Sequence, residues 1–176
     1  GAVDKPVEVE LLLEPVGIPN AKPRHEMDLR TCVLQLLTFL AQFHSKGFVH
    51  RDLRWSNLIR VGSAWRLIDF ELAGRAGQAL GASQELPVGR APPAVLARLK
   101  PWTDATDLWQ IGSLLIGQYP CSEAAAAFGK ALCDGEFVTS KHALEALPKL
   151  WPEPASSGLA LEMKSADGAG DSKAKS

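Results

Sequence analysis

The sequence predicts an α+β domain that is mainly α. Four stretches between residues 28 and 150 carry apolar residues at helical spacing or runs of strong helix formers, and shorter stretches alternate in the manner of strands. The chain has 176 residues, of which 46% are hydrophobic, so it is long enough for one domain with a substantial buried core.

The first predicted elements are a strand and a helix. Residues 7–17 (VEVELLLEPVG) begin with alternation and become fully apolar, which is typical of a strand that ends at Pro15. A helix is predicted over residues 28–45, because its apolar residues recur every three or four positions. Asp28 is the predicted N-cap of this helix, and Gly47 is expected to stop it.

A hairpin and a long loop are predicted next. Residues 64–70 (AWRLIDF) alternate as a short strand, with residues 61–63 as the turn of the hairpin. Residues 71–93 are rich in Gly, Ala and Pro and have little periodicity. Loops of this length are commonly functional.

Three further helices are predicted in the second half of the chain. Residues 103–117 are apolar on more than one face, which indicates a helix that is almost completely buried. Two shorter helices follow over residues 122–133 and 140–150, with Ser122 and Ser140 as the predicted N-caps.

The composition indicates a disordered tail and argues against two classes of partner. Pro, Ser, Gly, Ala and Lys dominate residues 152–176, so residues 1–151 form the predicted domain. A net charge of -1 gives no electrostatic support for a nucleic-acid or membrane-surface partner. No apolar run approaches the roughly 18 residues that a membrane span needs.

The cysteines favour an intracellular protein. Cys32, Cys121 and Cys133 lie far apart and form no CxxC pair, which disfavours a zinc site or a disulfide framework and fits a reducing compartment. The start of the chain shows no signal peptide. A cytoplasmic or nuclear location is therefore expected.

One short segment concentrates charged and amide side chains between apolar ends. In FVHRDLRWSNLI, residues 48–59, five such side chains lie within eight positions: His50, Arg51, Asp52, Arg54 and Asn57. A solvated loop needs no such order, and a core strand could not hold these charges unpaired. The segment is therefore the leading candidate for a functional site.

This segment and four others resemble motifs of the eukaryotic protein kinases. HRDLRWSN resembles the catalytic loop, LIDFE the metal-binding D-F-G, RAPPAVL the A-P-E motif, TDLWQIG the start of the buried central helix, and LLLEPVG the strand before the hinge. The resemblance covers residues 7 to about 150. It implies a protein-kinase-like C-terminal (large) lobe with a short hairpin and a hinge strand at residues 7–16, and with the N-terminal lobe absent.

The resemblance assigns chemistry to the charged turn. It implies that Asp52, at a solvent-facing position, accepts or orients the substrate hydroxyl, and that Arg54 bridges to the transferring phosphate. Asn57 and Asp69 would be the ligands of Mg²⁺, which prefers hard oxygen donors. Arg51 resembles the arginine that reaches a phosphorylated residue of the activation loop.

The resemblance also implies an ATP site and a structural anchor. The backbones of Glu14 and Val16 would hydrogen-bond the edge of adenine, and Leu58 and Ile59 would form the apolar floor beneath it. Asp107 would hold the backbone of the turn at residues 50–51. Its position at the start of a predicted helix is alternatively explained by the helix dipole alone.

Several departures from the family pattern keep other functions open. Nothing upstream of Leu11 resembles a glycine-rich phosphate loop, Glu71 replaces the glycine of D-F-G, and Pro93 replaces the glutamate of A-P-E. Between Gly117 and Ser122 there is little room for the usual substrate-docking helix. The function expected from the resemblance is ATP- and Mg²⁺-dependent transfer of the γ-phosphate to a protein Ser or Thr hydroxyl. The alternative is a non-catalytic pseudokinase scaffold, which the missing lobe and the altered D-F-G and A-P-E favour.

A third alternative is a small-molecule kinase, because IDFE also resembles the choline kinase and aminoglycoside phosphotransferase branch. The combination of HRDLRWSN with LIDFE is most similar to divergent kinase-like proteins of microbial eukaryotes, including some Crinkler-type effectors. The expected partners are an unidentified protein substrate and a missing N-terminal lobe or regulatory protein.

Overall fold

The computed structural model describes residues 17–19, 21–82, 84–117 and 122–153, and this part of the chain is mainly helical, as predicted. The elements, in chain order, are α1 (Glu26–Ser45), β1 (Phe48–Val49), a 3-10 turn (Trp55–Asn57), β2 (Leu58–Val61), β3 (Ala64–Leu67), β4 (Gly74–Arg75), α2 (Pro93–Leu96), α3 (Asp104–Gly117), α4 (Glu123–Asp134) and α5 (Ser140–Leu150). Residues 7–16 of the strand predicted at residues 7–17 lie outside the described residues.

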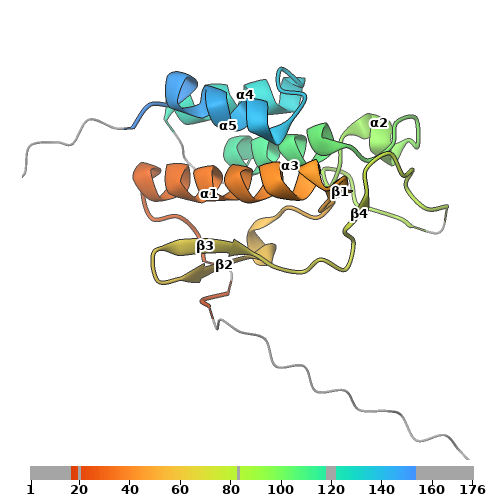
Figure 1. Cartoon of the computed structure of the whole chain (residues 1–176), viewed down its shortest axis with the longest axis horizontal. Helices are drawn as coiled ribbons and strands as arrows, with labels where there is room; N and C mark the ends of the chain where they lie inside the picture. The colour runs from red at the N-terminus through yellow and green to blue at the C-terminus, as the bar shows by residue number, and fades with distance from the viewer. Residues whose placement is uncertain (1–16, 20, 83, 118–121, 154–176) are drawn as a thin grey trace, which may run out of the picture.

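Helix α1 lies between the hairpin and the other long helices. It packs against β3 on one side and against α5 on the other, while α3 packs along α4 (Figure 1). The predicted apolar stripe of α1 accounts for this position, because Leu29, Val33, Leu37 and Leu40 are all buried in the main core. Burying such a stripe is the main source of stability for a helix of this kind.

The start of α1 differs from the prediction. The helix begins at Glu26, and the Nδ1 atom of His25 accepts a hydrogen bond from the Asp28 N–H, so His25 is the N-cap. Asp28 is instead buried, and its carboxylate accepts hydrogen bonds from the side chains of Arg60 and Trp65. The predicted cap was wrong because Asp28 binds the hairpin, which lies more than 30 residues away in the chain.

The N-caps of α4 and α5 show one prediction confirmed and one corrected. Ser122 caps α4 by accepting a hydrogen bond from the Ala125 N–H, as predicted. Helix α5 is capped by Thr139, and the predicted cap, Ser140, is a buried residue that hydrogen-bonds His44. Either residue satisfies the cap preference, so packing decides between them.

The described strands form two small antiparallel pairs. Strands β2 and β3 form the predicted hairpin, with Val61 opposite Ala64 and a turn of only two residues. The second pair, β1 with β4, places Val49 opposite Gly74. Strand β4 lies inside the segment predicted as a loop, and it is too short to leave a periodic pattern in the sequence.

The segment between β4 and α3 has a small core of its own. The buried members of this core are Val49 of β1 and, from the segment itself, Leu80, Ala91, Val95 and Trp102. This second cluster fixes the long connection against the charged turn, so the connection is ordered despite its lack of regular structure.

Helices α3 and α4 cross at a pair of glycines. A Cβ atom added to Gly112 would lie 2.5 Å from the carbonyl oxygen of Gly129, so no other residue fits there without a shift of the helices. This close approach lets the apolar faces of both helices pack directly.

The end of the described structure is tied to α1. Trp151 is fully buried and donates its ring N–H to Glu26, while the Nε of Arg30 donates to the Trp151 carbonyl. The first residues of the predicted tail are thus ordered, since Glu153 forms an ion pair with Arg30 at 3.1 Å. Residues 154–176 lie outside the described residues.

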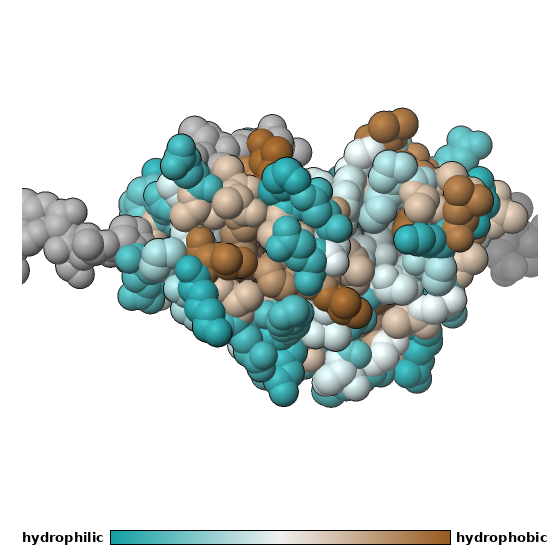
Figure 2. Space-filling view, turned by 90° about the horizontal axis from the view of Figure 1, so that it is seen from above, coloured by the Kyte–Doolittle hydropathy of each residue, from teal (hydrophilic) through white to brown (hydrophobic). Residues whose placement is uncertain are grey.

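The surface seen from the α4 and α5 side carries hydrophobic residues in separate spots among hydrophilic ones (Figure 2). Within the described residues, no helix combines the length and apolar character that crossing a bilayer requires.

Candidate active site

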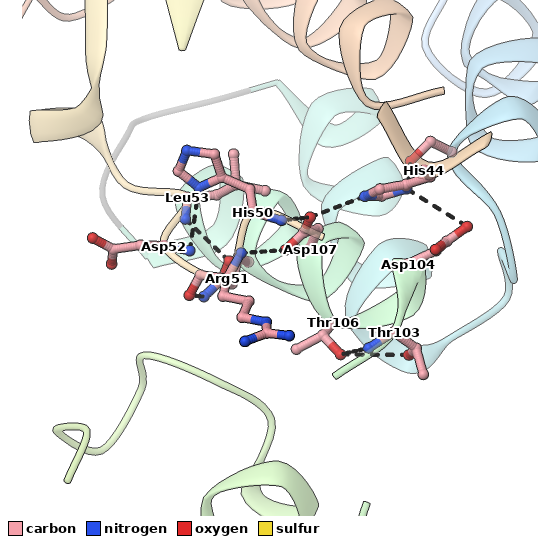
Figure 3. Close-up of polar contacts among 11 residues, drawn as sticks. His44, His50, Arg51, Asp52, Leu53, Thr103, Asp104, Thr106 and Asp107 are labelled. Atoms are coloured by element: carbon pink, nitrogen blue, oxygen red, sulfur yellow. Dashed lines mark hydrogen bonds and ion pairs between the residues drawn. The ribbon is translucent and has the colours of Figure 1, made fainter. Parts of the chain in front are cut away.

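The charged turn is held in place from one side by Asp107 of α3. This carboxylate is fully buried and accepts hydrogen bonds from the backbone N–H groups of His50 (2.7 Å) and Arg51 (2.9 Å) (Figure 3). Arg51 has φ of 73°, a left-handed conformation that persists only where surrounding contacts enforce it. The anchoring role predicted for Asp107 is confirmed.

A histidine from α1 completes this anchor. The Nε2 of His44 lies 2.9 Å from Asp107, and its Nδ1 lies 2.9 Å from the hydroxyl of Ser140 in α5 (Figure 3 shows the first contact). A carboxylate only accepts, so Nε2 carries a hydrogen, while Nδ1 faces both the Ser140 hydroxyl and, at 3.6 Å, the carboxylate of Asp104. One buried imidazole thus connects α1, α3 and α5 to the turn. The sequence analysis did not single out His44, although it continues the buried stripe four residues after Leu40.

Gln110, one helical turn after Asp107, fixes the next part of the turn. Its side-chain oxygen accepts a hydrogen bond from the Leu53 N–H at 3.0 Å, and its amide nitrogen donates to the carbonyls of Arg51 and Arg90. The side chain therefore joins the turn to the segment that precedes α2. Nothing in the sequence singled out Gln110, because all its partners are distant in the chain.

His50 packs beneath the turn as a neutral ring. It is fully buried, its Nδ1 accepts from the Asp52 N–H, and its Nε2 donates to the Ile68 carbonyl. Burial lowers the pKa of His50, although the nearby charge of Asp107 opposes that effect. Its ring also contacts Phe70 edge-on, with centroids 4.9 Å apart.

The carboxylate of Asp52 points away from Asp107 (Figure 3) and lies among three other functional groups. Its Oδ2 accepts a hydrogen bond from Asn57 Nδ2 at 2.8 Å and lies 3.1 Å from Arg54 Nε. Its Oδ1 forms an ion pair with Arg90 Nη2 at 2.9 Å. The turn therefore brings together the three predicted catalytic residues, together with an arginine that sequence reasoning missed.

Asp52 is more enclosed than the sequence suggested. It was expected at a solvent-facing position, but only 6% of the residue is exposed. The guanidinium groups of Arg54 and Arg90 cover it, and both are themselves about one-third exposed, at 40% and 31%. The correction has a simple cause, since a single sequence does not reveal that Arg90 returns to this carboxylate.

The predicted metal ligands lie on adjacent backbone segments. The Ile68 N–H donates to the Asn57 carbonyl at 2.9 Å, which brings the end of the hairpin against the turn. Asn57 donates through Nδ2 to both the carbonyl and the carboxylate of Asp52, so its Oδ1 is directed away from them. Asp69 is exposed, with φ of 64°. These oxygens fit a hard cation such as Mg²⁺.

Among the described residues, no group of three or more His, Cys, Asp or Glu side chains could hold a metal ion by itself. A cation bound between Asn57 and Asp69 would therefore need further oxygen ligands, such as phosphates or water.

The residues predicted to bind adenine are only partly described. Glu14 and Val16 lie outside the described residues. Leu58 is fully buried in the main core, whereas Ile59, the next residue of β2, is partly exposed. Successive side chains of a strand face opposite ways, so Leu58 is directed into the core, and the expectation that it forms part of an adenine floor is corrected. The role of Ile59 stays a prediction.

Comparisons with known proteins agree with this geometry. Residues 9–146 match the family model described as protein kinase domain. The chain belongs to the protein kinase family. Crinkler effector protein 8 of Phytophthora infestans is 32% identical over 110 residues, covering 61% of this chain and 18% of that protein.

Other relatives are established kinases by name. Cyclin-dependent kinase F-3 of Oryza sativa subsp. japonica is 32% identical over 92 residues, which cover 51% of this chain and 21% of that protein. Calcium/calmodulin-dependent protein kinase type II of Caenorhabditis elegans is 35% identical over 96 residues, covering 51% and 13%. This kinase-family chain thus spans only 13% to 21% of the length of these three relatives.

Arg51 has partners within this kinase domain. Its guanidinium lies 2.7 Å from the Arg75 carbonyl and 2.6 Å from the side-chain oxygen of Gln78, and it stacks over Trp102. Gly74 makes this possible, because a Cβ there would lie 2.5 Å from the guanidinium. Burial lowers the pKa of Arg51 from its usual value. An uncharged amide, that of Gln78, thus contacts the guanidinium that was expected to reach a phosphorylated residue.

Proposed function

We propose that this chain is the C-terminal lobe of a protein kinase that transfers the γ-phosphate of ATP, with Mg²⁺, to a Ser or Thr hydroxyl of a protein. The observation that carries the proposal is the contact set of Asn57. Its amide hydrogen-bonds Asp52, and its carbonyl accepts from the residue before Asp69. The turn therefore holds a proton acceptor and one metal ligand, and its hydrogen bond to Ile68 brings the segment of the second ligand, Asp69, against it.

Each residue has a defined role in the proposed reaction. The acceptor oxygen forms a bond to the γ-phosphorus, the bond from that phosphorus to the β-γ bridging oxygen breaks, and ADP leaves. Asp52 receives the hydroxyl proton, while Arg54 offsets charge on the transferring phosphate. Asn57 and Asp69 would hold Mg²⁺, which when bound neutralises charge on the phosphates.

The proposed ATP site requires a second lobe. Most of the rate of phosphoryl transfer comes from positioning and electrostatic stabilisation. We infer that an N-terminal lobe, or a regulatory protein in its place, covers the nucleotide bound beside Ile59, with Glu14 and Val16 at the adenine edge. An intracellular location fits Cys32 and Cys133, which are free thiols.

A non-catalytic scaffold is the second candidate. The observation that favours it is that both carboxylate oxygens of Asp52 face arginines, at 2.9 Å and 3.1 Å. Glu71 and Pro93, which replace family residues, point the same way. A small-molecule kinase is less well supported, because it rests on Glu71 and the family match is to protein kinases.

Titration calorimetry on the 176-residue chain tests the nucleotide site. Without a second lobe, Mg²⁺-ATP should bind with a Kd of about 1 mM, or about 4 kcal/mol. Binding should disappear in EDTA and in Asp69→Asn. Tight binding in EDTA, or unchanged binding by Asp69→Asn, would show that the site lies elsewhere.

Phosphotransfer itself is tested on the longest natural form of the protein with radiolabelled ATP and generic protein substrates. The kinase proposal expects incorporation that is lost in Asp52→Asn, while the 176-residue chain alone should show none. Absence of incorporation by the long form, with the nucleotide site intact, would favour the scaffold.

A further inference from the structure

A small pocket lies beside Asp52 on the side that faces the segment before α2. It has a volume of about 70 Å³, and its lining includes Asp52, Arg54, Gly89, Arg90 and Ser113. A single water needs only about 10–15 Å³ of such space, so the pocket has room for a larger group. It lies next to the atom that would receive the substrate proton.

The two arginines approach opposite oxygens of Asp52. Arg54 lies on the Oδ2 side, where Asn57 also binds, which is the side of the metal ligands. Arg90 lies on the Oδ1 side, away from Asn57. Arg54 is already assigned to the transferring phosphate, so Arg90 is the guanidinium on the side of the acceptor.

The charges of this cluster are unbalanced. Two guanidinium groups face one carboxylate, which leaves an excess of one positive charge at the pocket. The Nε atom of Arg90 is also buried without a hydrogen-bond partner among the described residues. A buried donor without a partner is costly, and a guanidinium binds an anion most strongly through two parallel N–H groups.

The backbone of Arg90 is fixed while its side chain faces the pocket. The Arg90 N–H donates to the Pro87 carbonyl at 3.1 Å, closing a turn in which Gly89 has φ of 86°, and Gln110 binds the Arg90 carbonyl. Val88, on the same turn, is 96% exposed and presents an apolar surface beside the pocket. The turn therefore offers a charged and an apolar contact together.

We propose that Arg90 binds an anionic side chain of the acceptor protein, a carboxylate or a phosphate close to the hydroxyl, so that the substrates are acidic sequences. The anion would balance the second guanidinium and compete for Arg90, which releases Oδ1 of Asp52 to receive the proton. A neutral acceptor would leave Asp52 paired with Arg90. This inference rests on the proposed kinase function.

The test measures peptide binding, which does not depend on phosphotransfer. Three labelled peptides share one sequence around a serine and differ at the neighbouring positions, which are Asp, Asn or phosphoserine. Fluorescence anisotropy on the 176-residue chain should show the Asp and phosphoserine peptides binding at least about tenfold more tightly than the Asn peptide, less so at high salt. Tighter binding of only one of these two peptides would show whether the pocket binds a carboxylate or a phosphate.

Matched variants assign the preference to Arg90. Arg90→Gln should abolish it, Arg90→Lys should retain part of it because lysine keeps the charge and loses the planar fork, and Arg66→Gln should leave it intact. Arg66 is exposed on β3 and gives the same change in net charge. Thermal melts identify any variant that fails to fold, in which case Arg90→Lys decides.

The outcomes separate the two proposals. Equal binding of the three peptides, no measurable binding, or an acidic preference that survives in Arg90→Gln would overturn the anion site. An acidic preference that depends on Arg90 supports the anion site even if the long form shows no phosphotransfer. Such a result would contradict only the proposed kinase function. Phosphotransfer that is equally fast for Asp and Asn peptides would leave the kinase function standing and count against the site.

Discussion

The turn at residues 50–57 has two sides with different physical character. On one side its backbone is held by α3, where Asp107 and Gln110 supply buried hydrogen bonds. On the other side its side chains meet partly exposed arginines and the exposed Asp69. The first side has hardly any access to water, whereas on the second side Arg54, Arg90 and Asp69 reach water and the two arginines cover Asp52.

This difference separates stability from chemistry. A buried donor that loses its acceptor has no water to replace it, whereas an exposed charge that loses its partner is resolvated. Substitutions on the α3 side should therefore change the free energy of unfolding, and those on the open side should change binding with little effect on folding. The expectations below test that division, beginning with the largest expected change in stability and ending with the smallest.

Asp107→Ala should give the largest loss. It leaves two backbone N–H groups and the His44 ring without an acceptor, so urea denaturation should show a loss of about 3 kcal/mol. Asp104→Ala, on the same helix, removes only the longer contact of a partly exposed carboxylate with His44, at 3.6 Å, and should cost about 1 kcal/mol or less.

Asp52→Ala sharpens the same comparison from the open side. It removes contacts with two partly exposed arginines, which water can replace, so the loss should be about 1 kcal/mol. A larger loss for Asp52→Ala than for Asp107→Ala would contradict the division between the two sides of the turn.

Gln110→Leu should have an intermediate effect. The substitution keeps most of the volume but removes the acceptor for Leu53 and the donor for two carbonyls, for a loss of about 2 kcal/mol by urea denaturation. Ser113→Ala, a neighbour on α3 whose contact is with Cys133, should change stability by less than about 1 kcal/mol. Equal effects would mean that Gln110 does not fix the turn.

His50 should make stability depend on pH. Burial lowers its pKa in the folded chain, while the unfolded chain takes up the proton near pH 6.5. Below that pH the unfolded state binds more protons, so the free energy of unfolding should fall on acidification, and above it the effect vanishes. Denaturation at pH 7.5 and 5.5 should show a shallower dependence for His50→Asn, and no change of slope for the exposed His142→Asn.

Asp69→Asn should have the smallest effect on folding. Asp69 is exposed, and Asn tolerates its φ of 64° well, so stability should change by about 0.5 kcal/mol or less while metal-dependent nucleotide binding is lost. Asp69→Ala would add the cost of that backbone conformation. Intact binding together with reduced stability would place Asp69 on the structural side.

Sequence reasoning recovered the parts of this site that lie close together in the chain. Asp52, Arg54 and Asn57 are separated by only a few residues, so the density of charged and amide groups in one segment predicted that they act together. Asp107 was predicted through the family motif around it, and the structure gives the reason, since two backbone N–H groups need its carboxylate.

The parts that were missed depend on contacts between distant segments. Arg90 reaches Asp52 only because the small core around Trp102 fixes the intervening chain, and although Arg90 begins the RAPPAVL motif, that motif gives the residue no role of its own. Gln110 and His44 were missed for the same reason, as were the bonds that made Asp28 and Ser140 structural residues rather than caps. Local propensity identifies candidates for a role, and tertiary contacts select among them.

The position of Trp151 sets where this domain can be shortened. The family match ends at residue 146, yet Trp151 is fully buried, and Arg30 bonds to its carbonyl and to Glu153. A fragment that ends at residue 146 would leave a cavity the size of an indole ring between α1 and α4. It would also leave the buried Arg30 without its two partners, the Trp151 carbonyl and Glu153. Limited proteolysis of the intact chain should accordingly yield a resistant product whose C-terminus lies at or beyond Glu153.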